Sequence, residues 1–484
     1  MTSVGNALPG SDLARHAESD SRPPALPPPP DYSALGYPPA GYPPPNYVGA
    51  HTASGGAGAS TPGGPPHTTR HGVTRMRGFS TTIFAEMTAL ATKTGAINLG
   101  QGFPDSDGPS VMLRAAVDAI QTGHNQYAPG PGEPALRTAI AQHQGDWYGL
   151  DYDPGTEVLV TAGATEAIAA TLMALCEPGD EVLCVEPYYD SYPAVIALAG
   201  AVRRPVTLTA PDYRLDTAAL AATITQRTRV VLINSPHNPT GAVFDRQELA
   251  EVARLCVEHD LIAVTDEVYE HMVFHGEHAP LATFPGMRER TVTISSAGKT
   301  FSATGWKVGW VCAAPDLVAA IARVKQFLTF TNAAPFQPAI AAALALPRDY
   351  YTGLAAELRA KRDLLCKGLV AAGFDVHIPS GTYFVTADAE PLGGEDGIAF
   401  CRALPERCGV VAVPVGVFYD QDAHEQVPGA SLIRFAFCKQ ESVLAEAVAR
   451  LAALRDGRPV IDEPTERRLP GAGAPVPWTQ EPPR

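Results

Sequence analysis

Lysine is scarce in this 484-residue sequence, and one lysine has surroundings that suit covalent chemistry. Lys299 follows an apolar, strand-like run and lies among small residues in SSAGKTFSATGWKVGW (295–310), where the backbone can approach another molecule closely. A lysine that is desolvated there has a lowered pKa, and its neutral amine attacks carbonyl carbons. The alternative is a lysine that snorkels from the end of a strand. Lys325, Lys361 and Lys367 lie in helical, charge-bearing stretches, where we expect solvated side chains.

An aspartate and a tyrosine follow another apolar run, in VTDEVYEH (264–271). Asp266 ends this run, with Tyr269 three residues further on, so we expect it at the carboxyl end of a sheet strand. Open α/β sheets bind their ligands at that edge. A buried carboxylate needs a cation, and a protonated heterocyclic nitrogen would serve. The alternative is an aspartate that caps a helix at a strand–helix junction.

Three further segments carry polar groups that fit the same edge. Asn238 begins Asn-Pro-Thr-Gly after the apolar run VVLINSP, although these residues are also ordinary turn formers. Gly163, Ala164 and Thr165 stand between a strand-like run and a helical pattern, and N–H groups at the start of a helix bind anions. Arg434 lies inside the apolar run LIRFAF, where a buried guanidinium needs an anion such as a carboxylate.

Together these groups describe a single ligand. It has a phosphate, a carbonyl that a lysine captures, a ring nitrogen that is kept protonated, and a phenolic oxygen. Pyridoxal phosphate has all four, and a lysine with an acidic partner for the ring nitrogen is its known arrangement. Arg434 would then receive the α-carboxylate of an amino acid.

The elements that must position these residues alternate between helical patterns and short runs that are almost uniformly apolar. Such runs are typical of strands buried on both faces of a mostly parallel sheet. From about residue 315 the pattern turns helical and then ends in shorter strands at 381–387 and 431–437. We therefore predict an α/β fold, with a large domain around a mostly parallel sheet and a smaller α+β domain. The runs predicted as strands of the large sheet are 158–163, 181–187, 230–236, 261–267, 291–297 and 308–314.

The composition divides the chain further. Proline- and glycine-rich tracts near both ends cannot form a packed core and predict disorder. Met76, which begins the patterned sequence, is an alternative start. The predicted division is a tail over 1–75, the N-terminal part of the small domain over 76–108, the large domain over 109–340, the rest of the small domain over 341–456, and a second tail over 457–484.

Charge and cysteine content exclude several classes. The chain has 36 Lys and Arg against 51 Asp and Glu, a formal net charge of −15, which argues against nucleic-acid or anionic membrane partners. None of its eight cysteines forms a C-x-x-C pair, and we expect small core residues and no metal site. Apolar runs are too short to cross a bilayer, and MTSVGNALPG is not a secretory signal. We expect a cytoplasmic protein.

Seven motifs in order make the chain resemble the class I/II aminotransferases, which have the fold type I architecture of pyridoxal-phosphate enzymes. The resemblance runs from about residue 76 to 455 and implies a homodimer. It rests on INLGQGFPD (97–105), NQYAPGPGEPALR (125–137), GATEAI (163–168), EPYYDSY (186–192), NSPHNPTG (234–241), TDEVYEH (265–271) and the segment 295–310.

The resemblance implies a role for each matching residue. Lys299 would form the Schiff base and shuttle the proton, Asp266 would hold the pyridine nitrogen, Asn238 and Tyr269 would bond the ring 3-oxygen, and Tyr189 would stack on the ring. The phosphate would be held by Ala164, Thr165, Ser296 and Lys307, while Tyr127 would reach the phosphate in the neighbouring subunit. The substrate carboxylate would be bound by Arg434, the backbone near Gly102 and Asn238, with Phe84 over the substrate.

The implied activity is ping-pong transfer of an amino group between an amino acid and a 2-oxo acid. Within the family, the chain is similar to actinobacterial N-succinyldiaminopimelate aminotransferases, which serve lysine biosynthesis, and to the kynurenine, glutamine and methionine aminotransferase branch. Relatives that act on aromatic substrates carry an aromatic residue and a histidine just before a C-P-x-Q segment. The matching stretch here, 331–337, reads TNAAPFQ and has neither of them before its APFQ segment, which weakens an aromatic cage and favours the succinylated substrate.

Two other classes share this scaffold. A cysteine-conjugate β-lyase would use the same cofactor residues, and only the fate of the carbanion differs. A regulator built on an aminotransferase-like domain carries an N-terminal helix-turn-helix. Residues 1–75 show no amphipathic helix pair, which argues against the regulator.

Overall fold

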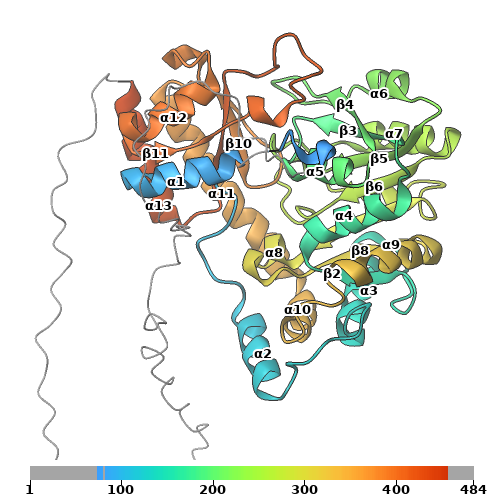
Figure 1. Ribbon diagram of the computed structural model, residues 1–484. Coiled ribbons are helices and arrows are strands. Elements are labelled where there is room, and N and C mark those ends of the chain that lie inside the picture. The colour runs from blue at the N-terminus through green and yellow to red at the C-terminus, as the bar shows by residue number, and fades with distance from the viewer. Residues whose placement is uncertain (1–72, 80–81, 456–484) are drawn as a thin grey trace, which may run out of the picture. The chain divides into compact units, whose positions relative to one another are not determined.

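The structure is a computed structural model, and it describes residues 73–79 and 82–455 (Figure 1). Its largest sheet has seven strands in the order β2-β8-β7-β6-β5-β3-β4. Only β8 runs antiparallel to its neighbours, β2 and β7, so the sheet is mostly parallel, as predicted. The strands are β2 (Val158–Thr161), β3 (Glu181–Glu186), β4 (Val202–Thr207), β5 (Thr228–Asn234), β6 (Ile262–Asp266), β7 (Thr291–Ser296) and β8 (Gly309–Cys312).

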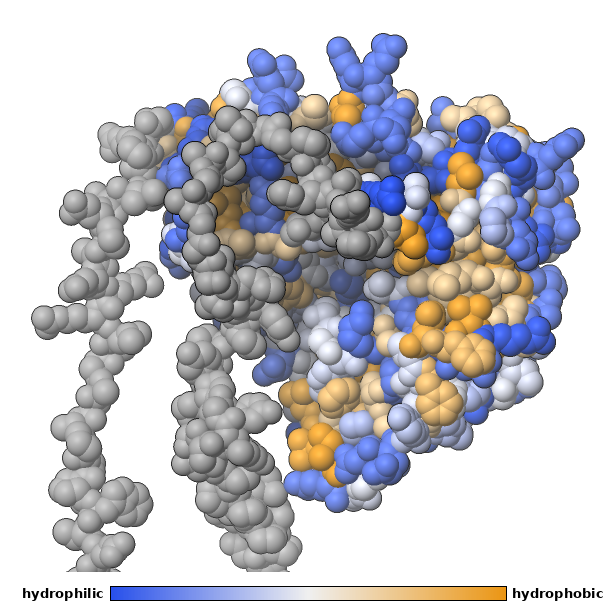
Figure 2. Space-filling view, viewed as in Figure 1, coloured by the Kyte–Doolittle hydropathy of each residue, from blue (hydrophilic) through white to orange (hydrophobic). Residues whose placement is uncertain are grey.

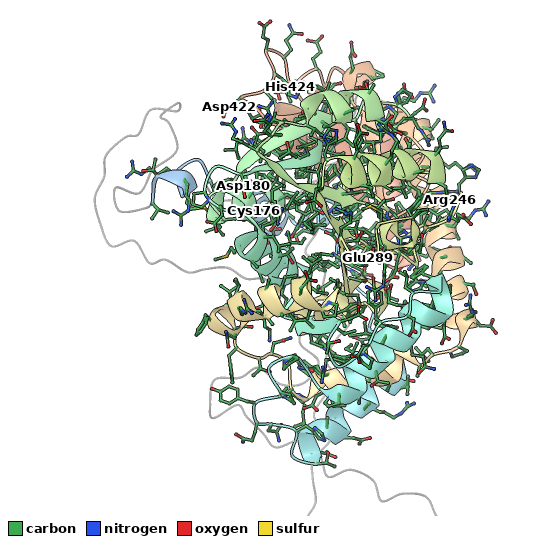
Figure 3. The ribbon with its side chains drawn as sticks, turned by 90° about the vertical axis from the view of Figure 1, so that its right-hand side faces the viewer. Cys176, Asp180, Arg246, Glu289, Asp422 and His424 are labelled. Carbon is green, nitrogen blue, oxygen red and sulfur yellow. The ribbon has the colours of Figure 1, made fainter. Side chains whose placement is uncertain are left out.

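Helices cover both faces of this sheet, because its strands are apolar on both sides. One face packs against α4, α5 and α9, and the other against helices that include α3, α7 and α10. Charged side chains such as Arg246 and Glu289 lie on the outside (Figure 3). The helices of this part are α2 (Ser110–Gln121), α3 (Pro134–Tyr148), α4 (Gly163–Leu175), α5 (Ser191–Leu198), α6 (Thr217–Thr223), α7 (Arg246–Glu258), α8 (Ala297–Thr300), α9 (Pro315–Leu328) and α10 (Phe336–Leu344).

A second group of elements surrounds a four-stranded antiparallel sheet in the order β12-β13-β10-β9. Beside it, β1 pairs in parallel with β11, so residues from near the start of the described chain join residues from near its end. This group comprises α1 (Ile83–Thr94), β1 (Ile97–Asn98), α11 (Arg348–Ala372), β9 (Asp375–His377), β10 (Phe384–Asp388), α12 (Gly397–Cys408), β11 (Val410–Val411), β12 (Val413–Pro414), β13 (Leu432–Ala436) and α13 (Glu441–Leu451).

The six predicted strands of the large sheet are present, and one more was missed. The missed strand, β4, reads VRRPVT and lies at the edge of the sheet, where polar residues and Pro205 are tolerated because one side of the strand needs no partner. The predicted strand at 381–387 begins only at Phe384, since Thr382 has a φ of 65° and cannot continue an extended strand.

Two expectations about single residue types had different outcomes. All eight cysteines are free and buried, as expected for core residues. The expectation of a solvated Lys325 was wrong: its side chain is buried, and Nζ donates to the backbone oxygens of Gly130 (3.1 Å) and Phe330 (2.8 Å). Those two carbonyl groups replace the water that a lysine amine otherwise needs.

The predicted tails fall almost entirely on residues 1–72 and 456–484, which lie outside the described residues. Thr74–Met76 form a 3₁₀ turn. The proposed domain boundaries stay a prediction. Within residues 73–79 and 82–455, no helix is both long and apolar enough to cross a membrane.

Candidate active site

A cavity of about 160 Å³ lies at the carboxyl ends of β6 and β7, between these strands and the start of α4. Nine of the predicted site residues line it: Ala164, Thr165, Tyr189, Asn238, Asp266, Tyr269, Ser296, Lys299 and Lys307. They come from six separate segments of the chain, and the mostly parallel sheet gathers them because its strands end at one edge. Polar and charged groups therefore meet in one cavity within an otherwise apolar core.

The Lys299 amine is held by an aromatic hydroxyl. Lys299 lies in the single turn of α8, and its Nζ donates to the hydroxyl of Tyr383 at 2.9 Å. That hydroxyl in turn donates to the backbone oxygen of Gly102 at 2.6 Å. Burial lowers the pKa of Lys299 to about 8, so a substantial fraction of the amine is neutral near physiological pH. The amine can therefore act as a nucleophile, which is the chemistry expected of a desolvated lysine at this position.

Asp266 is a buried carboxylate with few partners. One oxygen accepts from the hydroxyl of Tyr192 at 2.7 Å, and the other accepts a long bond of 3.4 Å from the backbone N–H of Val268. Burial raises its pKa, and the positive charge of Lys299 opposes this only in part. No cation within the described residues forms an ion pair with Asp266. A protonated nitrogen beside this carboxyl would supply the missing positive charge.

The start of α4 forms an anion cradle. The N-cap residue is Ala162, whose side chain cannot accept a hydrogen bond, and among the described residues the only backbone N–H that Glu166 bonds is that of Ala162 itself, so the N–H groups of the first turn have no capping side chain. Gly163 has a φ of 75°, and a Cβ built there would come within 3.1 Å of the Lys307 amine. Thus the amine lies against the helix start. A Cβ at Gly309 would lie 2.6 Å from the backbone of Gly163, so β8 presses on the same turn.

Arg434 is buried within β13, with an exposed fraction of 2%. It donates to Asn238 Oδ1 at 2.9 Å and to the backbone oxygen of Gly100 at 3.0 Å, while its Nε has no hydrogen-bond partner in the part of the chain that the structure describes. Burial lowers its pKa to about 10. No carboxylate among the described residues forms an ion pair with it, so the guanidinium can still receive an anion.

Three predicted residues lie beside the cavity or away from it. Phe84 lies under the Arg434 guanidinium, 5.1 Å from the ring centroid, and Gly102 is joined to Lys299 through Tyr383. Tyr127 does not line the cavity. Its side chain is 81% exposed and contacts the Phe330 ring edge-on.

Sequence reasoning missed three residues that hold the others in place. Tyr192 donates to Asp266, Tyr383 accepts from Lys299, and Asn234 accepts from the Asn238 backbone and donates to the Asp266 backbone. Tyr192 and Asn234 lie in motifs that were recognised, EPYYDSY and NSPHNPTG. Nothing marked Tyr383, since an aromatic residue in an apolar strand looks like core.

Comparison with known proteins agrees with this geometry. The family model of aminotransferase class I and II matches residues 94–451. A probable N-succinyldiaminopimelate aminotransferase of Mycobacterium tuberculosis is 54% identical over 392 residues, covering 79% of this chain and 98% of the relative. A methionine aminotransferase of Escherichia coli is 41% identical over 376 residues, covering 77% and 96%. The solved structure of N-succinyldiaminopimelate aminotransferase from Mycobacterium tuberculosis superposes with a TM-score of 0.77 at 54% identity, over 79% of this chain and all of the other.

The chain belongs to the class I and II aminotransferases, and it is a transaminase of fold type I. Members of this family depend on pyridoxal phosphate. The cavity fits that cofactor on three counts: a buried carboxylate without a cation, a lysine with a lowered pKa, and a helix start with free N–H groups beside a second lysine.

Proposed function

We propose that this aminotransferase acts on an amino acid with a distal carboxylate, of the N-succinyldiaminopimelate kind, and so takes part in lysine biosynthesis. The relative with 54% identity carries that name. The observation that carries the choice of an α-amino acid is Arg434, whose buried guanidinium has an unpartnered Nε and no carboxylate among the described residues. An incoming α-carboxylate would complete it in a two-pronged contact.

Each residue of the cavity has a proposed task toward the cofactor. When bound, pyridoxal phosphate supplies an aldehyde that captures an amine and a ring that accepts the electrons left at the substrate Cα. Asp266 would keep a proton on the ring nitrogen, Asn238 and Tyr269 would bond the 3-oxygen, and Tyr189 would cover one ring face. The phosphate would be held by Ala164, Thr165, Ser296 and Lys307.

Lys299 is the proposed catalytic residue. Its lowered pKa allows the neutral amine to take the proton from the substrate Cα. The protonated amine would then deliver this proton to the cofactor carbon. Tyr383 accepts a hydrogen bond from Nζ and so aims the amine, while its own proton is committed to Gly102. Arg434, with Asn238 and the backbone near Gly102, fixes the carboxylate so that the Cα–H bond points at that amine. Phe84 closes the substrate side.

We also propose a homodimer in which Tyr127 reaches the phosphate of the neighbouring subunit. Tyr127 is exposed to 81% although it lies in a motif of the family, and it has no contact with the cavity of its own chain. Apolar side chains gather on the face that carries α2 and α9 (Figure 2). They include Val117, Ile120, Phe327, Leu328 and Phe330. Such a patch is typical of a protein interface.

The methionine aminotransferase at 41% identity keeps a second substrate class open. One observation weighs against an aromatic substrate: Asn332 donates to the backbone oxygens of Thr161 and Lys307, both at 3.1 Å. This residue therefore braces the phosphate side of the cavity and offers no ring. A β-lyase would need a leaving group on the substrate β-carbon. The cytoplasmic location stays a prediction.

The test is a comparison of amino donors with the purified protein. We expect the highest kcat/KM with N-succinyl-diaminopimelate and 2-oxoglutarate, and lower values with methionine, glutamine and kynurenine. A preference for methionine or kynurenine would contradict the proposed substrate and leave the transaminase intact. Release of pyruvate and ammonia from a cysteine conjugate, faster than amino transfer, would favour the lyase.

A further inference from the structure

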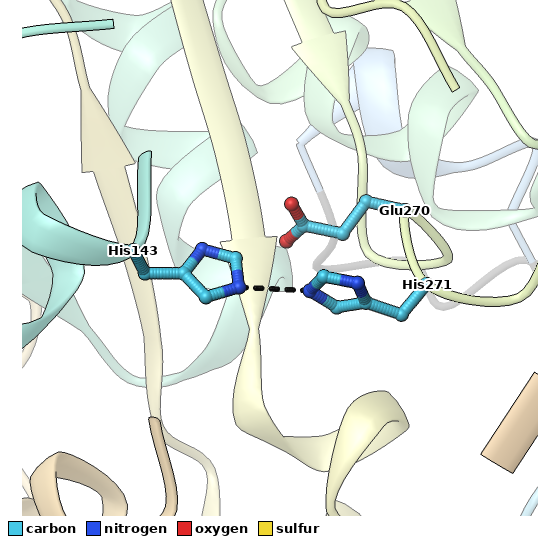
Figure 4. Close-up of side chains that lie close together, drawn as sticks. All are labelled: His143, Glu270 and His271. Atoms are coloured by element: carbon cyan, nitrogen blue, oxygen red, sulfur yellow. Dashed lines mark hydrogen bonds between the residues drawn. The ribbon is translucent and has the colours of Figure 1, made fainter. Parts of the chain in front are cut away.

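A cluster of three buried side chains lies on the other side of the sheet from the cofactor cavity. His143, Glu270 and His271 each offer one nitrogen or oxygen atom, and these atoms lie within 4.8 Å of one another (Figure 4). The three side chains are between 5% and 8% exposed. Nothing in the proposed transamination uses them.

The fold forces these residues together. Leu136, Ile140 and His143 share the buried face of α3, so the helix carries an imidazole into the core that this face packs against. Glu270 and His271 lie in the turn that follows β6, one residue beyond Tyr269. The Nε2 atoms of the two histidines are 2.8 Å apart, a hydrogen bond in which one imidazole donates and the other accepts.

We propose that this cluster is a binding site for a divalent transition-metal ion, with Zn²⁺ as the ion it fits best. Two imidazole nitrogens and one carboxylate oxygen are a known zinc ligand set that leaves one position for water. Imidazole also suits copper, nickel and iron, whereas magnesium and calcium prefer oxygen ligands.

The protonation of the ligands suits a metal. Metal-binding histidines must be neutral and the carboxylate ionised. The 2.8 Å hydrogen bond between the two Nε2 atoms requires that at least one of the two rings carries no proton on that nitrogen. Glu270 accepts from the hydroxyls of Tyr148 and Ser295, both at 2.7 Å, as an ionised carboxylate does. These hydroxyls would orient the carboxylate from outside the coordination shell.

The surroundings leave room for the ion to enter. A cavity of about 330 Å³ adjoins His143, and another of about 270 Å³ adjoins Glu270 and His271. A tetrahedral zinc ion with nitrogens at about 2.0–2.1 Å holds them roughly 3.3 Å apart. The two imidazoles therefore need to separate by only about half an ångström from their metal-free hydrogen bond.

A bound ion would join α3 to the turn that carries Tyr269. It would therefore act as a brace behind the cofactor cavity, about one residue away from a side chain proposed to contact the cofactor. This consequence does not depend on which amino acid is the substrate, and the binding test below needs no activity.

The experiment is a calorimetric titration of the untagged holoenzyme with ZnCl₂ after dialysis against a chelator. We expect one tightly bound ion per chain, and loss of that binding in His143→Gln and His271→Gln, which keep the bulk of the side chain. Tyr148→Phe should weaken the binding by about 10–100-fold, because it removes an outer partner of the carboxylate. The matched control is His259→Gln, which removes an exposed histidine at the end of α7.

X-ray absorption of the zinc-loaded wild-type protein gives a second readout that needs no variant. Two imidazole nitrogens with oxygen neighbours would support the site. Sulfur neighbours would overturn it, as would the absence of stoichiometric zinc or full zinc binding in both histidine variants. Far-ultraviolet circular dichroism and the cofactor absorbance establish that each variant is folded.

Discussion

Two buried polar clusters flank the turn after β6, and they differ in how completely the chain satisfies them. In the cofactor cavity, Asp266 has one short hydrogen bond, and beside it Arg434, which bonds the cavity residue Asn238, has an Nε without a partner among the described residues. On the other side, Glu270 accepts two hydroxyls at 2.7 Å and the histidines bond each other. Burial alone therefore does not mark a catalytic site. Buried charged groups that lack partners beside a cavity are the stronger indication, because a ligand in the cavity can supply what is missing.

The two clusters are kept apart by the alternation of a strand. Ser295 and Ser296 are consecutive in β7, so their side chains point to opposite faces of the sheet. Ser295 donates to Glu270, while Ser296 lines the cofactor cavity. A shift of one residue in this strand would exchange the two, which is why the register matters for function.

The largest effect should come from a substitution in the cofactor cavity. We expect Lys299→Ala to lower kcat by about 10²–10⁴-fold, because it removes the amine proposed to move the Cα proton. The visible absorbance of the bound cofactor should change as well. Steady-state kinetics and a spectrum check this, with Lys93→Ala, an exposed lysine of α1, as the control. Turnover near that of the wild type would remove Lys299 from the mechanism.

A second substitution sharpens the role of the unpartnered guanidinium. Arg434→Lys loses the forked contact with a carboxylate, and breaking such a buried pair costs about 2–5 kcal/mol, or roughly 30-fold to several-thousand-fold in affinity. We expect KM for the amino acid to rise while cofactor affinity changes little. Arg402→Lys, which alters an exposed ion pair with Glu86, is the matched control. An unchanged KM would assign the carboxylate to another residue.

The pH profile tests the lowered pKa of Lys299. The amine is protonated below its pKa of about 8, so the rate at which the cofactor-free chain captures pyridoxal phosphate should rise about tenfold per pH unit up to that value and then level off. The negative charge of Asp266 raises this pKa, so Asp266→Asn should move the profile to lower pH. Stopped-flow absorbance measures the rate, and a profile without a break near pH 8 contradicts the assignment.

The smallest effects, on stability, should have opposite signs in the two clusters. Burial raises the Asp266 pKa, so the stability from its protonated form is present below about pH 3.9 and is lost as the pH rises through the folded value. At neutral pH, Asp266→Asn should therefore raise the melting temperature of the cofactor-free protein. Glu270→Gln should lower the melting temperature, because one hydroxyl loses its acceptor. The expected loss in the free energy of unfolding is about 1–3 kcal/mol. Calorimetry at pH 7 compares them, and a common sign would refute the distinction.

Much of the fold was predictable because strands that are buried on both faces of a sheet appear in the sequence as apolar runs. The edge strand β4 escaped because it is polar and contains Pro205. Lys325 was wrongly expected to be solvated, because a charged residue in a helical pattern does not show that two backbone carbonyl groups will accept hydrogen bonds from its amine in the fold.

The residues of the candidate site could be predicted where they belong to local sequence motifs. Asp266 ends one apolar run and Asn238 follows another, and the shared sheet edge brings them together. Tyr383 could not be found in this way, since its task is set by the Gly102 carbonyl, 281 positions away. His143 and His271 are 128 positions apart, and no spacing rule for metal ligands covers such a distance.

The pairing of β1 with β11 also bears on how the chain is made. The backbone of Ile97 can form its strand pairing only after Val410 has been synthesised. At about 5–20 residues per second, a ribosome needs roughly 15 to 60 s to deliver the intervening stretch. During that time α1 and β1 have no strand to complete them, and Phe84 has no Arg434 to lie against. The earliest part of the described chain to be synthesised is thus among the last to reach its place, and a nascent-chain protease assay should find it sensitive until β13 has emerged.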